Sequence, residues 1–420
     1  METSLDHGTR SRRDRFRSHM RAFNPTAPAM EMIRSGYVIE ALHSDVYRHL
    51  GGRADLELGC RQVVAGGIGS GKTTELLLAY RWLQENSNAI ALFIDVSRET
   101  DLSVLNYGAL VASFGLHLGR MLQSEKAGIS LDVGMRAKAV KASKTLQDFA
   151  YGKTDYIWVQ DDDYEPPDFE PDFDDVPPQR LIVKETKGKL VQPFPVLQRD
   201  LQEIRKPLDI LIDLARGAGR DPIVFFDGLD RLITPSKFWS VVEQDFTVLQ
   251  DLKVSVICTG PISILFDTDK SVSDHFARAL HLPAMRVSSI ELRDVVLKRQ
   301  GEQLLTAEQI DRICHYSGGL LRDLITLGRD AAEEAYVSNA DQIRDEDVTK
   351  AARQLGESYL RGLGSQHHTL LEQLSSGKGF EITNSTAQEL LATRRVIEYS
   401  GTEFGVHPSL SMAMEGIYHG

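Results

Sequence analysis

The sequence predicts an α/β fold in which a parallel sheet is sandwiched by helices and followed by a helical lid and a C-terminal winged helix. Three observations support this prediction. Short apolar runs alternate with segments of helical periodicity as far as residue 287, as in parallel sheets that are covered on both faces. From Ser288 the strand pattern stops and helical patterns follow one another. The chain closes with a helical segment and two short strand patterns separated by a turn.

The composition is that of a folded, water-soluble chain. Its 420 residues suit two or three domains, and 42% hydrophobic with 26% charged residues is ordinary for globular proteins. No apolar run is long enough to cross a bilayer, and the N-terminus lacks the apolar region of a secretory signal. The three cysteines, Cys60, Cys258 and Cys314, share no metal-ligand spacing and do not indicate a disulfide framework. We therefore expect a cytoplasmic protein without membrane contact.

Residues 1–27 form a basic N-terminal arm. It carries Arg10, Arg12, Arg13, Arg15, Arg17 and Arg21, whereas the whole chain has a net charge of -12. That net charge opposes general attraction to nucleic acid, so any DNA contact has to be local. A solvated, frayed terminus is the favoured interpretation of the arm, and a local DNA contact is the alternative.

Residues 28–287 form the predicted core. We expect lead-in helices within 28–50, strands at 61–67, 91–96, 222–227, 253–261 and 278–285, and helices at 73–84, 103–122 and 196–219. Residues 124–195 interrupt this rhythm. Their acidic, proline-rich stretch 161–178 cannot support a helix interior or a core strand, so we interpret the segment as an insertion or a mobile loop.

Two smaller units follow the core. Residues 288–356 read as a helical lid because four segments of helical periodicity succeed one another. Residues 357–420 combine a helical stretch at 368–377 with two strand patterns around a two-residue turn, Ser400 and Gly401. This arrangement predicts a winged helix.

The segment GGIGSGKTT at 66–74 matches the pattern G-x-x-x-x-G-K-[ST], and it lies between a predicted strand and a predicted helix. Glycines let the backbone curl so that amide groups point at phosphates, and the following helix adds its positive end. Lys72 is expected to reach the β- and γ-phosphates, and Thr73 to offer its hydroxyl to Mg²⁺. The expected nucleotide-binding residues of this loop are Gly66, Gly67, Gly69, Ser70, Gly71, Lys72, Thr73 and Thr74.

Polar residues follow the later strands, where ligands of open α/β sheets bind. Asp227 ends the apolar strand PIVFFD and is expected to hold Mg²⁺. Asp230 is either an acid that orients the attacking water or an N-cap or surface acid. Thr259 ends the next strand and either senses the γ-phosphate or caps a turn.

Two arginines are candidates for contacts with the phosphates. Arg322 follows two glycines at the start of a lid helix, and it either reaches the γ-phosphate or forms a surface salt bridge. Arg278 precedes the last strand; the favoured interpretation is a solvated charge, and the alternative is an arginine supplied to a neighbouring subunit. Tyr37 and Val38 are candidates for contacts with the adenine.

This order of motifs resembles AAA+ ATPases and their STAND relatives over residues 30–356. The lid sequence from Tyr316 to Ala335 is similar to that of the origin-recognition and Cdc6 branch, and the resemblance implies that Arg322 acts as sensor 2. The DGLD sequence is more similar to STAND proteins, because Gly228 stands where AAA+ enzymes carry a glutamate. The resemblance implies ATP rather than GTP, and the missing glutamate implies slow hydrolysis.

Two functions follow from this resemblance. The first is an ATP-binding, slowly hydrolysing switch that controls a partner effector or its own nucleotide-dependent assembly, with bacterial antiviral defence as a natural setting. The alternative is a DNA-transaction ATPase of the initiator or transposition-regulator type that grips duplex DNA through the winged helix and the basic arm. Residues 361–420 contain four lysines and arginines against six glutamates, which favours protein contacts over DNA contacts.

Overall fold

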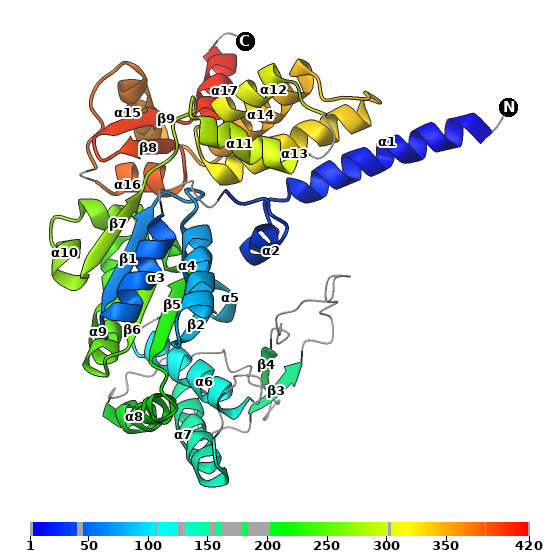
Figure 1. Cartoon of the computed structure of the whole chain (residues 1–420). Helices are drawn as coiled ribbons and strands as arrows, with labels where there is room; N and C mark the ends of the chain where they lie inside the picture. The colour runs from blue at the N-terminus through cyan, green and yellow to red at the C-terminus, as the bar shows by residue number, and fades with distance from the viewer. Residues whose placement is uncertain are drawn as a thin grey trace.

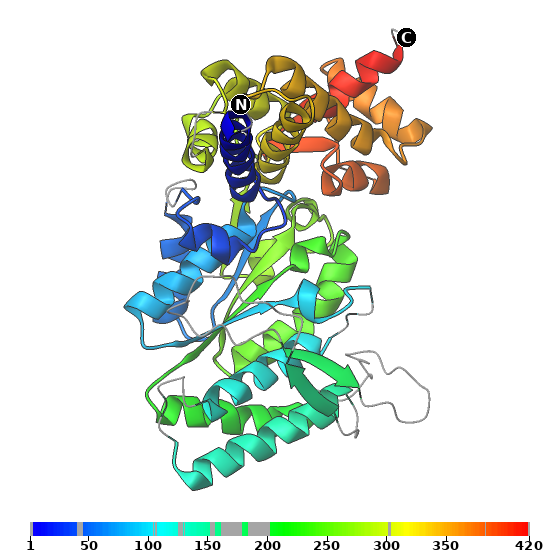
Figure 2. The same ribbon diagram turned by 90° about the vertical axis from the view of Figure 1, so that its right-hand side faces the viewer.

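The computed structural model confirms the predicted α/β fold. It describes residues 3–39, 45–103, 105, 107–124, 129, 131–151, 156–160, 179–183, 202–300, 304–382 and 384–418. The parallel sheet occupies the middle of the molecule, with the lid and the winged helix at one end and the helices α6, α7 and α8 at the other (Figures 1 and 2).

The central sheet has five parallel strands in the order β2-β5-β6-β1-β7. The strands are β1 (Arg61–Gly66), β2 (Ile90–Asp95), β5 (Pro222–Asp227), β6 (Ser255–Pro261) and β7 (Arg278–Leu282). The strands β5 and β6 are buried along their whole length, because their central residues are apolar, and the polar Asp227, Ser255 and Thr259 are buried with them. Since all strands run in one direction, their carboxyl ends meet at a single edge of the sheet, which faces the lid (Figure 1).

Helices cover both faces of the sheet, as predicted. Leu50 and Leu76 belong to the apolar cluster on one face, and Phe114 and Phe246 to the cluster on the other. The helices of the core are α2 (Ala29–Arg34), α3 (Val46–Leu56), α4 (Lys72–Asn86), α5 (Val96–Glu99), α6 (Ala109–Gln123), α8 (Gln202–Gly217), α9 (Pro235–Asp251) and α10 (Val272–His275), with short 3₁₀ turns η2 (Leu229–Arg231) and η3 (Ile262–Phe266).

The interval 124–195 holds more regular structure than predicted. It contains the helix α7 (Val133–Tyr151) and an antiparallel pair, β3 (Tyr156–Gln160) and β4 (Gln179–Val183). Ala139 and Leu146 of α7 are fully buried in the main core cluster. The mobile-loop alternative was wrong for α7, because the residues before the acidic stretch carry apolar side chains at helical spacing, whereas an insertion stays a prediction. Residues 161–178 lie outside the described residues.

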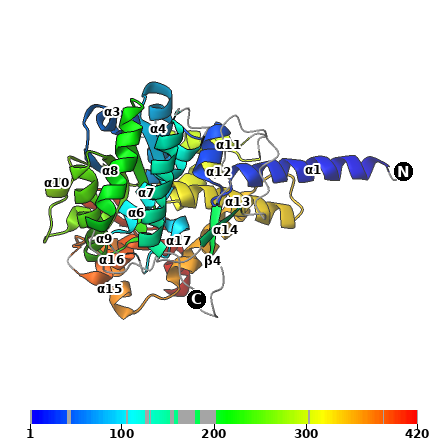
Figure 3. The ribbon, with the colours of Figure 1, turned by 90° about the horizontal axis from the view of Figure 1, so that it is seen from below.

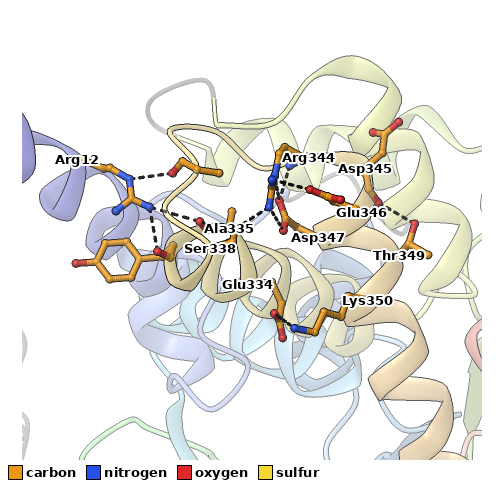
Figure 4. A network of polar contacts seen from close by, with 12 residues as sticks. Arg12, Glu334, Ala335, Ser338, Arg344, Asp345, Glu346, Asp347, Thr349 and Lys350 are labelled. Carbon is orange, nitrogen blue, oxygen red and sulfur yellow. Dashed lines mark hydrogen bonds and ion pairs between the residues drawn. The ribbon is translucent and has the colours of Figure 1, made fainter.

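The basic arm is not a frayed terminus. It forms the helix α1 (Thr3–Ala22), whose second half packs on the lid helix α13 through the buried Phe16 and Phe23. Gly328 of α13 makes room for this contact, because an added Cβ would lie 2.4 Å from Phe23. Arg12 donates hydrogen bonds to the carbonyl oxygen atoms of Tyr336, in the last turn of α13, and of Ala340, three residues beyond that helix (Figure 4). The first turns of α1 project away from the body of the molecule (Figure 3).

The lid and the winged helix lie side by side. The lid comprises α11 (Ile290–Arg299), α12 (Ala307–Tyr316), α13 (Leu321–Val337) and α14 (Asp345–Leu360), and the winged helix comprises α15 (Ser365–Ser375), α16 (Ser385–Ala392), β8 (Val396–Ser400) and β9 (Glu403–Val406). Ser400 pairs with Glu403, so the turn between the strands is Gly401 and Thr402 rather than the predicted Ser400 and Gly401. A final helix, α17 (Pro408–Tyr418), was not predicted and packs on α14. None of the helices in the described part of the chain is long and apolar enough to cross a membrane.

Candidate nucleotide-binding site

The loop from Gly66 to Thr73 joins β1 to α4 at the lid-facing edge of the sheet. Gly69 and Gly71 have φ values of 91° and 102°, which only glycine adopts readily. An added Cβ on Gly66 would lie 2.2 Å from the carbonyl oxygen of Leu282 in β7. Gly69 and Gly71 are therefore required by backbone conformation and Gly66 by close packing, and the loop opens directly into a 15-residue helix.

Lys72 is folded back onto its own loop. Its Nζ donates hydrogen bonds to the carbonyl oxygen atoms of Gly66 at 2.9 Å and Gly67 at 2.7 Å. The same atom forms an ion pair with Asp230 Oδ2 at 2.9 Å, and only 3% of the lysine side chain is exposed. Asp230 is thus neither an N-cap nor a free surface acid, because it neutralises the buried lysine.

Thr73 and Asp227 lie together, as expected for a magnesium site. Thr73 Oγ1 donates a hydrogen bond to Asp227 Oδ1 at 3.1 Å. Burial, followed by the negative charges of Asp230 and Asp95, raises the pKa of Asp227 to about 6. A hydroxyl beside a carboxylate that lacks a positive partner is the kind of oxygen pair that Mg²⁺ prefers, so the residues fit this ion. Binding of Mg²⁺ would also relieve the repulsion among the acids.

Thr259 is fully buried beside this pair. Its Oγ1 has no hydrogen-bond partner among the described residues. Thr259 lies one position beyond the paired Phe226 and Cys258, and so next to Asp227 across the sheet. The strand runs on to Pro261, so Thr259 does not end it as predicted. A buried hydroxyl without a partner fits a water or phosphate contact better than a turn cap.

The lid touches the loop directly. The backbone N–H of Leu321, the first residue of α13, donates to the carbonyl oxygen of Gly69 at 3.0 Å. Arg322 follows, and its Cβ would lie 3.2 Å from a Cβ built on Gly69. Partial desolvation, and then the positive charges of Arg394 and Arg231, lower the pKa of the Arg322 guanidinium. A bound phosphate would add negative charge beside Arg322 and Arg394, the second of which is paired with Asp323.

Two other candidates lie outside the phosphate end of the site. Tyr37 and Val38 link the lead-in segment to the lid, since their carbonyl oxygen atoms accept from Arg299 at 2.7 Å and Lys298 at 3.0 Å. Adenine binding there stays a prediction. Arg278 opens β7 and lies beside Gln62, at the strand end opposite the loop. It is not part of this chain's own site, and its role in a neighbouring subunit stays a prediction.

Sequence reasoning missed Asp95 and the reason for Gly228. Asp95 ends β2 beside Asp227 and accepts a hydrogen bond from Ser97 Oγ at 2.6 Å. Asp95 could have been found by the pattern that identified Asp227, an acid at the end of an apolar strand. Gly228 has φ 85°, and an added Cβ would lie 2.8 Å from the Cβ of Ser97. The position that carries a glutamate in AAA+ enzymes therefore has no room for a side chain here.

The missed residues also include Asp323 and Arg394. Asp323 is a buried acid on α13, and Arg394 lies on the winged helix and forms an ion pair with it. Neither residue belongs to a sequence motif, so only the packing of the winged helix against the lid identifies them.

Comparisons with known proteins find no matching family model and no matching curated protein. Three solved structures are similar to this chain at low identity. Cdc6p from Pyrobaculum aerophilum is 14% identical, with 95% of this chain and 89% of that chain covered and a TM-score of 0.43. The Aeropyrum pernix Orc1 protein in complex with DNA is 14% identical, with 90% and 93% covered and a TM-score of 0.44. The Thermotoga maritima RuvB Holliday junction branch migration motor is 14% identical, with 90% and 95% covered and a TM-score of 0.40.

Proposed function

We propose that the chain is an ATP-binding and slowly hydrolysing switch of the AAA+ and STAND type, in which the nucleotide sets the lid and thereby a partner effector or its own assembly. The contact between Leu321 and Gly69 carries the proposal, because it joins the lid to the phosphate loop. Any change in the loop when phosphates enter is transmitted to α13 without an intermediate. A ligand that binds one lid position better than another shifts the population between them.

Nucleotide binding requires an exchange of counterions. Phosphate oxygens take the place of Asp230 and the loop carbonyls around Lys72, and they accept hydrogen bonds from the loop amides. Thr73 and Asp227 would hold the Mg²⁺, which supplies charge neutralisation to the phosphates when bound. In the resting site, Asp230 therefore occupies the place beside Lys72 that a phosphate would take.

Slow hydrolysis follows from the residues that can hold a water. Gly228 has no side chain, so Asp230 is the acid left to orient the nucleophile. Asp230 is free for that task only after Lys72 has moved to the phosphates. Since hydrolysis depends mainly on positioning and electrostatics, an acid shared between two duties supports a low rate.

The test is ATP binding and turnover by the purified chain, with the oligomer size measured in each nucleotide state. Lys72→Ala and Asp227→Ala should abolish binding or magnesium dependence, whereas Lys141→Ala, an exposed lysine on α7, should change neither. Turnover that is slow and an assembly that changes with ATP support the switch. Nucleotide binding that is indifferent to both site variants refutes it. A role in antiviral defence stays a prediction, tested by phage challenge of cells that carry Lys72→Ala.

The second candidate function, a DNA-transaction ATPase, is favoured by one face of α1. Arg13, Arg17 and Arg21 are exposed at spacings of four residues, and none has an ion-pair partner among the described side chains. This arginine ridge is roughly 12 Å long, at 1.5 Å per residue. The winged helix offers no such surface. Its helix α16 has no lysine or arginine, and Arg395 donates to the carbonyl oxygen of Tyr359.

Duplex DNA binding measured against salt concentration tests this candidate. Neutralising the ridge by the triple change of Arg13, Arg17 and Arg21 to Ala should reduce the slope of log K against log salt by about 2.7, or 0.9 per phosphate contact. The matched change of the same residues to Lys should leave the slope nearly intact. Absence of binding even at low salt would remove the DNA-transaction candidate and leave the switch.

A further inference from the structure

The winged helix is seated on the lid through a buried carboxylate. Asp323 of α13 is 1% exposed and lies next to Arg322 in the chain. It forms an ion pair with Arg394 of the winged helix and accepts a hydrogen bond from the hydroxyl of Tyr359 at 2.7 Å. His407 Nε2 lies 3.3 Å from the same carboxylate. Asp323 is therefore a single anchor shared by the lid and the winged helix.

Arg394 lies at the phosphate end of the nucleotide site. It lines a narrow cleft together with Gly67 of the phosphate loop and Leu320 of the lid. It occupies the step between α16 and β8 in a left-handed conformation, with φ 65°. Its charge also acts on Arg322. This conformation closes the C-terminal end of α16, where the N–H groups of Arg394 and Arg395 donate to the carbonyl oxygen atoms of Leu391 and Leu390.

We propose that Arg394 is a second phosphate-sensing arginine, supplied by the winged helix, which exchanges Asp323 for the terminal phosphate of a bound nucleoside triphosphate. The inference rests on the proposed function, since it needs a nucleotide on the loop. Guanidinium groups bind carboxylates and phosphates with the same forked geometry, so the exchange replaces one strong partner by another. Asp323 keeps Tyr359 and His407 as donors after Arg394 leaves, which limits the cost of leaving a buried carboxylate behind.

Other contacts hold the winged helix in place when Arg394 leaves Asp323. Glu398 of β8 accepts a hydrogen bond at its carbonyl oxygen from the N–H of Ala284 at 2.9 Å, and its carboxylate lies 2.7 Å from His281 Nε2. These contacts join the winged helix to the end of β7, independently of Asp323. Release of Arg394 therefore removes one of several contacts of the winged helix, and His407 stays beside Asp323. A diphosphate, which lacks the terminal phosphate, would leave Arg394 on Asp323.

The experiment compares the affinity for a non-hydrolysable ATP analogue with that for ADP, both with Mg²⁺. Arg394→Ala should weaken binding of the triphosphate about tenfold or more, with ADP changed less than about twofold. Asp323→Asn should strengthen triphosphate binding several-fold, because it removes the competitor for Arg394. Arg394→Lys should restore part of the triphosphate affinity. The matched control is Arg395→Ala, since Arg395 holds the winged helix through carbonyl oxygen atoms of the same domain junction and does not line the cleft.

The outcomes separate this inference from the proposed function. If the wild type binds ATP in a Lys72-dependent way and Arg394→Ala binds both nucleotides like the wild type, the inference is wrong and the switch stands. If Arg394→Ala and Arg395→Ala weaken both nucleotides equally, Arg394 is only a docking residue and the inference is again wrong. If the wild type binds no nucleotide, the proposed function fails first. Should Arg394→Ala not fold, Asp323→Asn and Arg394→Lys decide the question with the same two ligands.

Discussion

Replacing Asp230 by Asn is expected to tighten nucleotide binding while it lowers turnover. In the resting site Asp230 is the counterion of Lys72, at 2.9 Å and with 16% of the acid side chain exposed. The lysine has to leave this carboxylate to meet the phosphates, and the carboxylate also repels them. Removing the charge of Asp230 also takes away one cause of the raised pKa of Asp227, which favours magnesium binding. The three effects act in the same direction on affinity.

The size of the effect follows from the geometry of the pair. Two unit charges 2.9 Å apart attract by about 6 kcal/mol at an effective dielectric constant of 20, before desolvation is subtracted. A hydrogen bond to a charged group retains about 1.5–3 kcal/mol of that as a net contribution. This range corresponds to about 10- to 150-fold tighter binding of ATP. Loss of the carboxylate that orients the water should reduce turnover by about a hundredfold.

Calorimetric titration with a non-hydrolysable ATP analogue and a phosphate-release assay measure the two effects separately. Asp251→Asn is the matched control, because it removes the same charge from an exposed position at the end of α9. It should alter neither quantity by more than about twofold. Unchanged or weaker nucleotide binding by Asp230→Asn would refute the view that Asp230 is the resting counterion. Unchanged turnover would refute its role in orienting water.

Three further substitutions test the packing around the site and the accessory helices. Gly228→Ala should lower the free energy of unfolding in urea by about 1–3 kcal/mol, since φ is 85° and the new Cβ would lie 2.8 Å from Ser97. Gly401→Ala, where the new Cβ meets open space, should be nearly neutral. Equal losses of stability in the two variants would contradict this expectation. Burial lowers the pKa of His19 from 6.5 to about 4, so as the pH falls the unfolded chain binds a proton before the folded chain does. The free energy of unfolding should therefore fall by about 3 kcal/mol from pH 6.5 to 4. His19→Asn should lose that part of the pH dependence, and an unchanged pH profile of stability would contradict this reasoning. Leu146→Ala, at a fully buried position of α7, should cost about 2–5 kcal/mol without changing ATP affinity, and a loss below about 1 kcal/mol would show that α7 is not part of the core.

Short sequence patterns correctly predicted the elements whose character depends on neighbouring residues in the chain. The strands that carry Gly66, Asp227 and Thr259 are apolar runs, and the loop motif is contiguous in the sequence. The pairing of Thr73 with Asp227 followed as well, because parallel strands deliver their carboxyl ends to one edge. These predictions needed no knowledge of which helix packs against which.

The remaining features depend on contacts between distant segments. The arm could not be read as a docked helix, because its partner Gly328 lies more than three hundred residues away, on the surface that Phe23 covers. The role of Asp230 as a counterion depended on where Lys72 turns when no phosphate holds it. Arg394 belongs to no sequence motif, and it lies near the phosphate loop only because the winged helix packs beside that loop. Sequence periodicity reports which face of an element is buried, but it does not identify the partner.

The charges around the loop explain why a nucleotide can connect three parts of this chain. The core supplies one buried cation, Lys72, and its acids Asp227 and Asp230 are close enough to raise the pKa of the first. The core also carries Arg231, and further cations near the loop come from the lid, as Arg322, and from the winged helix, as Arg394. A triphosphate therefore gains affinity from each part that closes on it. By reciprocity, whatever holds the lid or the winged helix in place changes the affinity for the nucleotide by the same factor. A partner that binds the lid or the winged helix would thus change the affinity of the loop for the nucleotide, which is the property that a switch requires.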